Sequence, residues 1–151
     1  MRVLALDLGE RRIGLAVSDE TASIAFPAGH LERKGLRQDL AALVALVRER
    51  GITSAVVGLP MHMDGRQGPE AERARMFANA FAEAAGIPVA LLDERWTSVA
   101  AERSLREGGR RSPRRRRATR GTVDAVAATL LLQTWLERRR QEEAAAGEGG
   151  R

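Results

Sequence analysis

Three carboxylates stand where an acidic side chain is unusual. Asp7 interrupts the apolar run 3–8, and Glu94 follows directly after the apolar run 88–92. Asp124 comes two residues after Thr122, ahead of small residues that would let a helix lie close to a sheet. Each acid also has an ordinary explanation, in turn hydrogen bonds, an exposed strand end or a helix dipole. A buried carboxylate is nevertheless costly, so these three are the first candidates for chemistry.

The chemistry that three such acids could share is metal-dependent phosphodiester hydrolysis. Hard divalent cations such as Mg²⁺ bind carboxylate and phosphate oxygens. Two of these ions, about 3.5–4 Å apart, can activate a water molecule and stabilise the leaving oxygen of a phosphodiester. Acids from separate elements that meet at one edge of a sheet would suffice. The sequence therefore predicts a candidate metal site, provided that the fold brings the acids together.

Other common chemistries are poorly supplied. The chain has no cysteine, which excludes disulfides, thiol catalysis and cysteine zinc sites, and its two histidines, His30 and His62, lie far apart. It has no Gly-x-Ser-x-Gly motif, no Walker loop and no G-x-G-x-x-G motif. The segment 7–9 with Gly14 also resembles the start of actin-like ATPases and sugar kinases. Those proteins need two such lobes, and 151 residues provide one.

The positive charge is confined to one segment. The chain carries a net charge of +5, but seven of its 25 basic residues are arginines within residues 110–120, which contain no acid. The rest of the chain has 18 basic against 20 acidic residues and is slightly acidic. Such a run is either a solvated loop or a contact for a polyanion. Aromatic residues make up only 3%, with no tyrosine, which disfavours a base-stacking surface.

The apolar periodicity predicts a mixed sheet flanked by helices, in the α/β class. The first three predicted strands follow one another, as a hairpin and a weaker third strand. The later strands alternate with helices. The strands are predicted at 3–8, 13–18, 23–26 (broken by Pro27), 55–59 and 88–92. The helices are predicted from 36 to Gly51, from Pro69 to Gly86, from Thr97 or Ser98 to Gly108–Gly109, and after a cap at Thr122.

Several helical residues are predicted to face inward. On the second helix these are Met76, Phe77, Ala80, Phe81 and Ala84, and on the last helix Val123, Val126, Ala127, Leu130, Leu131 and Trp135.

One domain is predicted over residues 1–140, followed by a disordered tail over 141–151, which has little to bury. No apolar run approaches the roughly 20 residues of a membrane helix. Met1 leads directly into a predicted strand, so we expect no signal peptide and no membrane contact. Together with the lack of cysteine, this predicts a cytoplasmic protein.

Four sequence blocks resemble a known family in their order and spacing. They are DLGERRIGLAVSD (7–19), VGLPMHMDGRQG (57–68), DERWTSVAAE (93–102) and RGTVDAVAATLLLQ (120–133). The chain from about residue 1 to 137 is similar to the YqgF family, also called the RuvX or pre-16S rRNA nuclease family. The resemblance implies an RNase H-like fold, with a five-stranded mixed sheet whose first three strands are antiparallel.

The resemblance also implies an activity, which is that of a bacterial, cytoplasmic nuclease dependent on Mg²⁺ or Mn²⁺. By position, Asp7, Glu94 and Asp124 match the family's catalytic, metal-binding acids. Members are linked to maturation of the 5′ end of 16S rRNA, hence to RNA and ribosomal particles, and some to cleavage of Holliday junctions. Two features depart from the family pattern: the basic stretch is expanded and entirely arginine, and Trp96 adds a large ring beside the expected site.

Further residues are expected to hold substrate phosphates. Arg95 would either do this or pair with a neighbouring acid, and Asp64 could simply form a turn. Arginine side chains grip phosphate with two nitrogens, which makes the basic segment the main expected contact. The substrate-binding candidates are Gly9, Arg12, Asp64, Gly65, Arg95, Arg114, Arg115, Arg116, Arg117 and Arg120.

Three functions remain open from the sequence. The first is processing of the 5′ end of pre-16S rRNA by a two-metal mechanism. The second is resolution of four-way DNA junctions, for which a homodimer would supply the two active sites that symmetric cleavage needs, whereas RNA processing suits a monomer. The third is a non-catalytic nucleic-acid-binding factor in ribosome assembly that keeps the fold.

Overall fold

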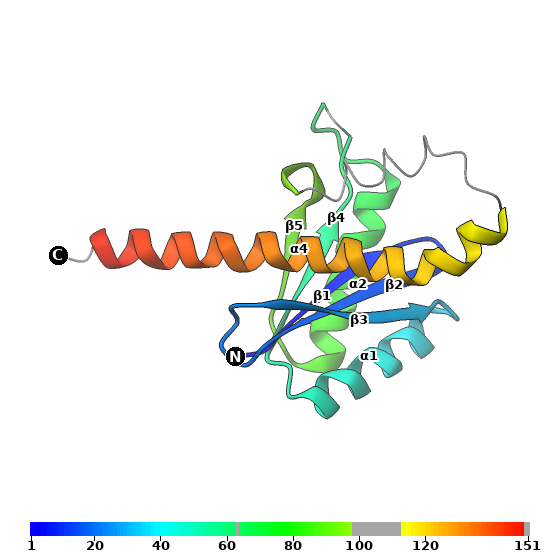
Figure 1. Ribbon diagram of the computed structural model, residues 1–151, viewed down its shortest axis with the longest axis horizontal. Helices are drawn as coiled ribbons and strands as arrows, with labels where there is room; N and C mark the ends of the chain where they lie inside the picture. The colour runs from blue at the N-terminus through cyan, green and yellow to red at the C-terminus, as the bar shows by residue number, and fades with distance from the viewer. Residues whose placement is uncertain (63, 98–112, 150–151) are drawn as a thin grey trace.

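The fold is built on one five-stranded mixed sheet (Figure 1). The computed structural model describes residues 1–62, 64–97 and 113–149, with side chains at all of these positions except 96, 113–124 and 148–149. The strand order is β3-β2-β1-β4-β5. β1 pairs antiparallel with β2 and β2 with β3, whereas β1–β4 and β4–β5 are parallel. The strands are β1 (Val3–Leu8), β2 (Arg12–Ser18), β3 (Ala25–Glu32), β4 (Ser54–Leu59) and β5 (Val89–Asp93).

Helices cover both faces of this sheet. One face carries α1 (Leu36–Arg50) and α2 (Pro69–Ala85), and the other carries the long α4 (Pro113–Gly149). A 3-10 turn, η1 (Glu94–Trp96), follows β5 directly. No helix in the described part of the chain is long and apolar enough to cross a membrane. The predicted α/β class and RNase H-like sheet, with its first three strands antiparallel, are confirmed.

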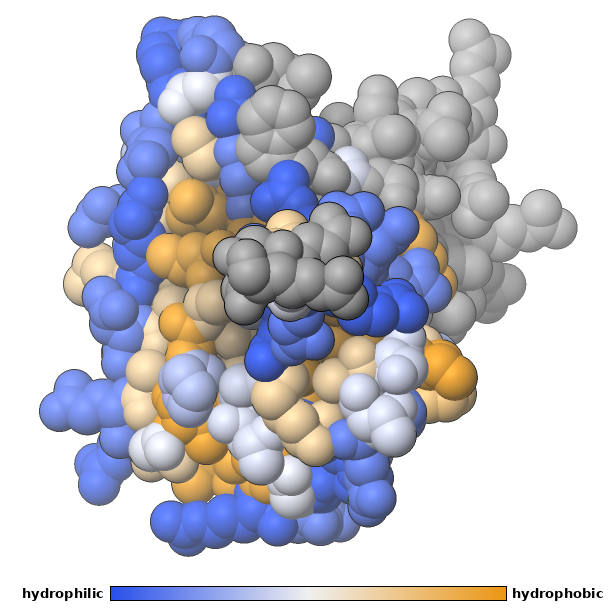
Figure 2. Space-filling model, turned by 90° about the vertical axis from the view of Figure 1, so that its left-hand side faces the viewer, coloured by the Kyte–Doolittle hydropathy of each residue, from blue (hydrophilic) through white to orange (hydrophobic). Residues whose placement is uncertain are grey.

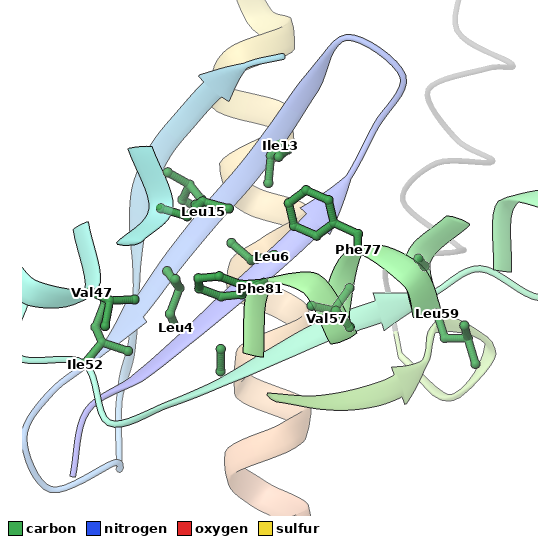
Figure 3. Close-up of a cluster of buried hydrophobic side chains, with 14 of the residues drawn as sticks. Leu4, Leu6, Ile13, Leu15, Val47, Ile52, Val57, Leu59, Phe77 and Phe81 are labelled. Atoms are coloured by element: carbon green, nitrogen blue, oxygen red, sulfur yellow. The ribbon is translucent and has the colours of Figure 1, made fainter. Parts of the chain in front are cut away.

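The alternation of side chains along β1 separates the two cores. Leu4 and Leu6 pack with Phe77 and Phe81 beneath α1 and α2 (Figure 3). Val3 and Ala5 belong instead to the second core, together with residues of α4. Because successive side chains of a strand point to opposite faces, Asp7 belongs to the α4 face. The side chain of Asp7 therefore lies on the face of the sheet that α4 covers.

Two helix ends follow their sequence signals. Gly51 caps the C-terminus of α1 and Gly86 that of α2, and both glycines are left-handed, with φ of 64° and 68°. Pro69 occupies the first turn of α2, where its missing N–H costs no hydrogen bond. The predicted bounds of these two helices are confirmed.

The third strand is longer than predicted. β3 runs from Ala25 to Glu32 and passes through Pro27, which was expected to break it. Among the described strands, β3 lies at the edge of the sheet and pairs with β2 alone. Since proline cannot donate to a ladder, an edge strand with one unpaired side is where it is tolerated. The ladder shifts register between Gly14 and Ala16, close to this proline's partner.

Some residues predicted to face inward are exposed. Met76 on α2 is 64% exposed and Val126 on α4 is 41% exposed, and Ala84 is also exposed. The buried stripe of α2 is instead made of Ala71, Ala74, Phe77, Ala78 and Phe81. Small alanines count weakly in a hydrophobic pattern, yet they let the helix approach the sheet closely. The buried face of α2 is therefore rotated by about one residue from the predicted face.

The last helix begins earlier and ends later than predicted. α4 starts at Pro113, so Thr122 lies inside the helix and is not its cap. The helix continues to Gly149, and the side chains of 141–147 are exposed, where a disordered tail over 141–151 was expected. Glutamate, glutamine and alanine are strong helix formers, which favours this extension without a core. Figure 1 shows α4 projecting beyond the sheet, and Figure 2 views the molecule from that side, with hydrophobic residues visible between hydrophilic ones. The predicted helix beginning at Thr97 or Ser98 falls at 98–112, outside the described residues.

Replacement of Phe81 by alanine tests the first core. The Phe81 side chain is fully buried, so Phe81→Ala should lower the free energy of unfolding by about 3–5 kcal/mol. Met76→Ala, on the exposed side of the same helix, should change it by less than about 0.5 kcal/mol. Urea unfolding followed by circular dichroism measures both values. Equal losses in the two variants would contradict this packing of α2.

Candidate functional site

Asp7 lies near the end of β1 and is 4% exposed. Its backbone partner on β2 is Gly14. On the other side of β1, Leu6 pairs with Val57 of β4, so continuing this register by one residue sets Asp7 beside Gly58. The carboxylate therefore lies on the α4 face, next to a residue of β4 that has no side chain.

Glu94 reaches the same glycine from the opposite direction. It opens η1, directly after β5, and is 7% exposed. A Cβ atom placed on Gly58 would lie 2.8 Å from Oε1 of Glu94 and 3.3 Å from Cδ2 of Leu131 in α4. The Glu94 carboxylate thus occupies the space that any side chain at position 58 would take. The structure thus places Asp7 and Glu94 as neighbours of Gly58.

Asp124 is placed by its backbone alone. It lies within α4, one turn before Ala127 and Ala128, which are buried against the sheet, and two turns before Leu131. Its side chain is outside what the structure describes. Among the described residues, no group of three or more histidine, cysteine, aspartate or glutamate side chains could hold a metal ion. The third carboxylate of the site therefore stays a prediction.

A tight turn follows Asp7. The amide of Gly9 donates to the carbonyl of Arg12 at 2.8 Å, and a Cβ atom on Gly9 would lie only 2.8 Å from that same oxygen. Only glycine fits so close to the opposing backbone. Gly9 and Arg12, both predicted to contact substrate, are thus the two ends of one turn beside Asp7.

The loop from 60 to 68 contains the second predicted turn. Gly65 has a φ of 91° and donates its amide to the His62 carbonyl at 2.9 Å. Asp64 accepts the amide of Arg66 at 3.0 Å and its Nε at 2.6 Å. The Arg66 amide is the main cause that holds the pKa of Asp64 below its ordinary value. These are the contacts of a turn-forming carboxylate.

Arg95 pairs with Asp93, a residue that the sequence reasoning did not single out. Its Nη2 lies 2.7 Å from Oδ2 of Asp93, and its Nε lies 3.0 Å from the same oxygen. Hydrogen bonding to Asp93 is the main cause that raises the pKa of Arg95 above its ordinary value. Nη1 of Arg95 is also 3.4 Å from a Cβ position on Gly65. The ion pair therefore fixes Arg95 where the 60–68 loop meets the end of β5.

The arginine segment is described only in part. Residues 113–120 are helical in their backbone, as the first turns of α4, and residues 110–112 lie outside the described residues. The side chains predicted to grip phosphate are not described. They are those of Arg114, Arg115, Arg116, Arg117 and Arg120. Their backbone places them on the helix that carries Asp124, less than three turns from it.

The donor chemistry at this edge of the sheet fits a hard divalent cation. Asp7 and Glu94 offer only carboxylate oxygens, which are the ligands that Mg²⁺ and Mn²⁺ take. Both acids are nearly buried, and both lie beside Gly58, whose missing side chain leaves space for the Glu94 carboxylate on the α4 face. The residues present are therefore suited to holding such an ion.

Comparison with known proteins agrees with this fold. The family model described as "RuvX: Holliday junction resolvase" matches residues 1–138. A protein of Anaeromyxobacter dehalogenans named "Putative pre-16S rRNA nuclease" is 48% identical over 139 residues, which cover 92% of this chain and 98% of that protein. A protein of Chloroflexus aurantiacus with the same name is 44% identical over 138 residues, covering 91% and 88% of the two chains.

Solved structures resemble the fold at low sequence identity. The RuvC of T. thermophilus in complex with a Holliday junction superposes with a TM-score of 0.56 at 16% identity, over 93% of this chain and 96% of that one. The Fowlpox virus resolvase, also bound to Holliday junction DNA, gives a TM-score of 0.53 at 10% identity, over 91% and 98%. The architecture is thus the RuvC-like form of the RNase H fold. Within it, the chain belongs to the RuvX family.

Substitution of Gly58 tests the contact at the centre of the site. Gly58→Ala should lower the free energy of unfolding by about 1–3 kcal/mol, because the new methyl group meets Glu94 and Leu131. In a Glu94→Ala background the same change should cost clearly less, since one obstacle is gone. Gly147→Ala, where a Cβ meets nothing within 4 Å, is the matched control and should not destabilise. Chemical denaturation of the wild type, the two single variants and the double variant measures this cycle, with Gly147→Ala measured alongside. An equal cost of Gly58→Ala in both backgrounds would contradict the contact.

Proposed function

We propose that this chain is a metal-dependent endonuclease that processes the 5′ end of pre-16S rRNA. The observation that carries the proposal is the pair of nearly buried carboxylates, Asp7 and Glu94, on either side of Gly58. The proposed substrate, pre-16S rRNA, is taken from the names of the relatives. The lack of cysteine agrees with a cytoplasmic location, where precursor ribosomal particles would be the partner.

The chain's own carboxylates would hold the metal. Asp7 and Glu94, joined by Asp124 from α4, would bind two Mg²⁺ or Mn²⁺ ions at the edge of the sheet. Bound there, the ions supply an activated water molecule and neutralise charge on the phosphate. Gly58 leaves space for the Glu94 carboxylate against β4, and the Gly9 turn fixes the backbone after Asp7. The products would be a 5′-phosphate and a 3′-hydroxyl.

Basic and loop residues around the acids would position the flanking phosphates. Arg12 and the backbone at Gly9 lie on one side of Asp7, and the Asp64–Gly65 turn approaches Arg95 on the other. Because Arg95 forms an ion pair with Asp93, its positive charge would stay in a fixed position beside the 60–68 loop. The arginines of residues 113–120 would provide the main phosphate contacts.

A second candidate is cleavage of four-way DNA junctions. It is favoured by the description of the matching family, and the fold is that of two resolvases bound to Holliday junctions. The third candidate, a non-catalytic ribosome-assembly factor, would need no metal at the acids. Cleavage of precursor rRNA and of a four-way junction, measured side by side, distinguishes all three.

Loss of the Asp7 charge should abolish cleavage and leave binding intact. Asp7→Asn should lower kcat with Mg²⁺ or Mn²⁺ by more than about 100-fold, because a metal-holding carboxylate is lost. Binding of precursor rRNA should change less than twofold. Glu83→Gln, which removes one exposed charge from α2, is the matched control and should cleave normally. A wild-type protein that cleaves neither substrate with either metal would support the non-catalytic function instead.

Salt dependence tests the arginine segment. If Arg114, Arg115, Arg116 and Arg117 each contact a phosphate, replacing all four by alanine should reduce the slope of log affinity against log salt by about 3. The matched control removes Arg138 and Arg140 from the exposed part of α4 and should leave the slope unchanged. Fluorescence anisotropy across a salt series measures it. An identical slope in the four-arginine variant would rule out this contact.

A further inference from the structure

Arg33 lies just after β3 and contacts both the turn that follows Asp7 and helix α2. Its Nη1 donates to the carbonyl of Gly9 at 2.9 Å. Its backbone amide donates to the carbonyl of Arg11 at 2.8 Å. Its guanidinium carbon lies 5.7 Å from the centre of the Phe77 ring, within the range of a cation–π contact. Arg33 therefore links the turn of Gly9 to α2.

Asp39 holds Arg33 from the other side. It lies in the first turn of α1 and is 2% exposed. One carboxylate oxygen accepts the amide of Lys34 at 2.9 Å. The other accepts no hydrogen bond from the described residues and lies 3.8 Å from Nε of Arg33. A buried carboxylate is costly without a nearby cation, so the Asp39 charge favours a fixed position of the guanidinium.

The guanidinium uses two different nitrogens for its two partners. Nε faces Asp39, and Nη1 faces the carbonyl of Gly9. Because the guanidinium is rigid and planar, its contact with Asp39 also fixes the nitrogen that donates to the Gly9 carbonyl. The flexible side chain of a lysine would fix this donor less well. The turn itself closes through the Gly9 amide and the Arg12 carbonyl. A chain of contacts thus runs from α1 through Asp39 and Arg33 to the residue two positions after Asp7.

We propose that Arg33, held by Asp39, is a positioning residue that fixes the turn from Gly9 to Arg12 and thereby the Asp7 carboxylate. This inference rests on the proposed function, in which Asp7 holds a metal ion. Arg33 touches neither substrate nor metal in this role. Its guanidinium contacts a buried acid through Nε and a backbone carbonyl through Nη1, and 31% of the side chain is exposed.

The test compares Arg33→Gln, Arg33→Lys and Asp39→Asn with a control, Arg37→Gln. Arg37 is an exposed residue of α1, and its replacement removes the same charge two residues before Asp39. Amide hydrogen exchange at Gly9 reports the turn directly. Manganese affinity, measured by paramagnetic broadening of the Gly9 resonance, reports the metal site. Steady-state cleavage separates kcat from KM.

We expect Arg33→Gln to speed exchange at Gly9 by about tenfold, as for the loss of one supporting hydrogen bond. Manganese affinity and kcat should each fall about tenfold or more, and the salt slope of binding should stay unchanged, because Arg33 itself contacts no phosphate in this role. Arg33→Lys should recover part of the loss. Asp39→Asn should act in the same direction, and the double variant Arg33→Gln/Asp39→Asn should be no worse than Arg33→Gln alone. Arg37→Gln should match the wild type.

Three results would overturn the inference. The first is unchanged exchange at Gly9 in Arg33→Gln. The second is a raised KM and a flatter salt slope with kcat unchanged, because Arg33 would then be a phosphate contact. The third is an equal rise in exchange at Val57 in the centre of the sheet, which would mark a general loss of stability. A wild-type protein that binds manganese but cleaves neither substrate would contradict the proposed function alone. Amide exchange at Gly9 and the manganese affinity of the variants would then still test the role of Arg33.

Discussion

The missing side chain at Gly58 is the constraint on which the site depends. A central strand of a parallel pair normally carries a branched residue, yet any Cβ here would meet the Glu94 carboxylate at 2.8 Å and a Leu131 methyl at 3.3 Å. The glycine lets the acid after β5 lie against the backbone of β4, beside the acid of β1. It also lets α4 approach the same face. Two carboxylates from strands that are not neighbours in the sheet can therefore share one edge.

Much of this arrangement could be predicted from the sequence because its signals are local. The buried strands are continuous apolar runs, and the ends of α1 and α2 are marked by glycines that adopt a left-handed conformation. Asp7 and Glu94 stood out because they break or end such runs. The family resemblance implied a five-stranded mixed sheet whose first three strands are antiparallel, but the strand order and the position of both acids beside Gly58 come from the structure alone. Gly58 was read only as part of a strand, although a glycine inside an apolar run often marks a close approach of another group.

The parts that were missed depend on contacts between distant segments. Arg33 and Asp39 look like ordinary surface charges in the sequence, and only the packing of α1 buries Asp39 beside Arg33. The alanine stripe of α2 was displaced towards Met76, since alanine contributes little to a hydrophobic pattern. The continuation of β3 through Pro27 depends on its place at the sheet edge. The start of α4 at Pro113 overrides a capping signal at Thr122.

In the proposed function, Asp7 and Glu94 together bind a divalent metal ion beside Gly58. The most direct measurement is anomalous X-ray scattering from crystals of the wild-type protein soaked in Mn²⁺. We expect a manganese peak on the α4 face of the sheet, about 2 Å from carboxylate oxygens of both residues. A fully soaked crystal with no peak between these two carboxylates would contradict it.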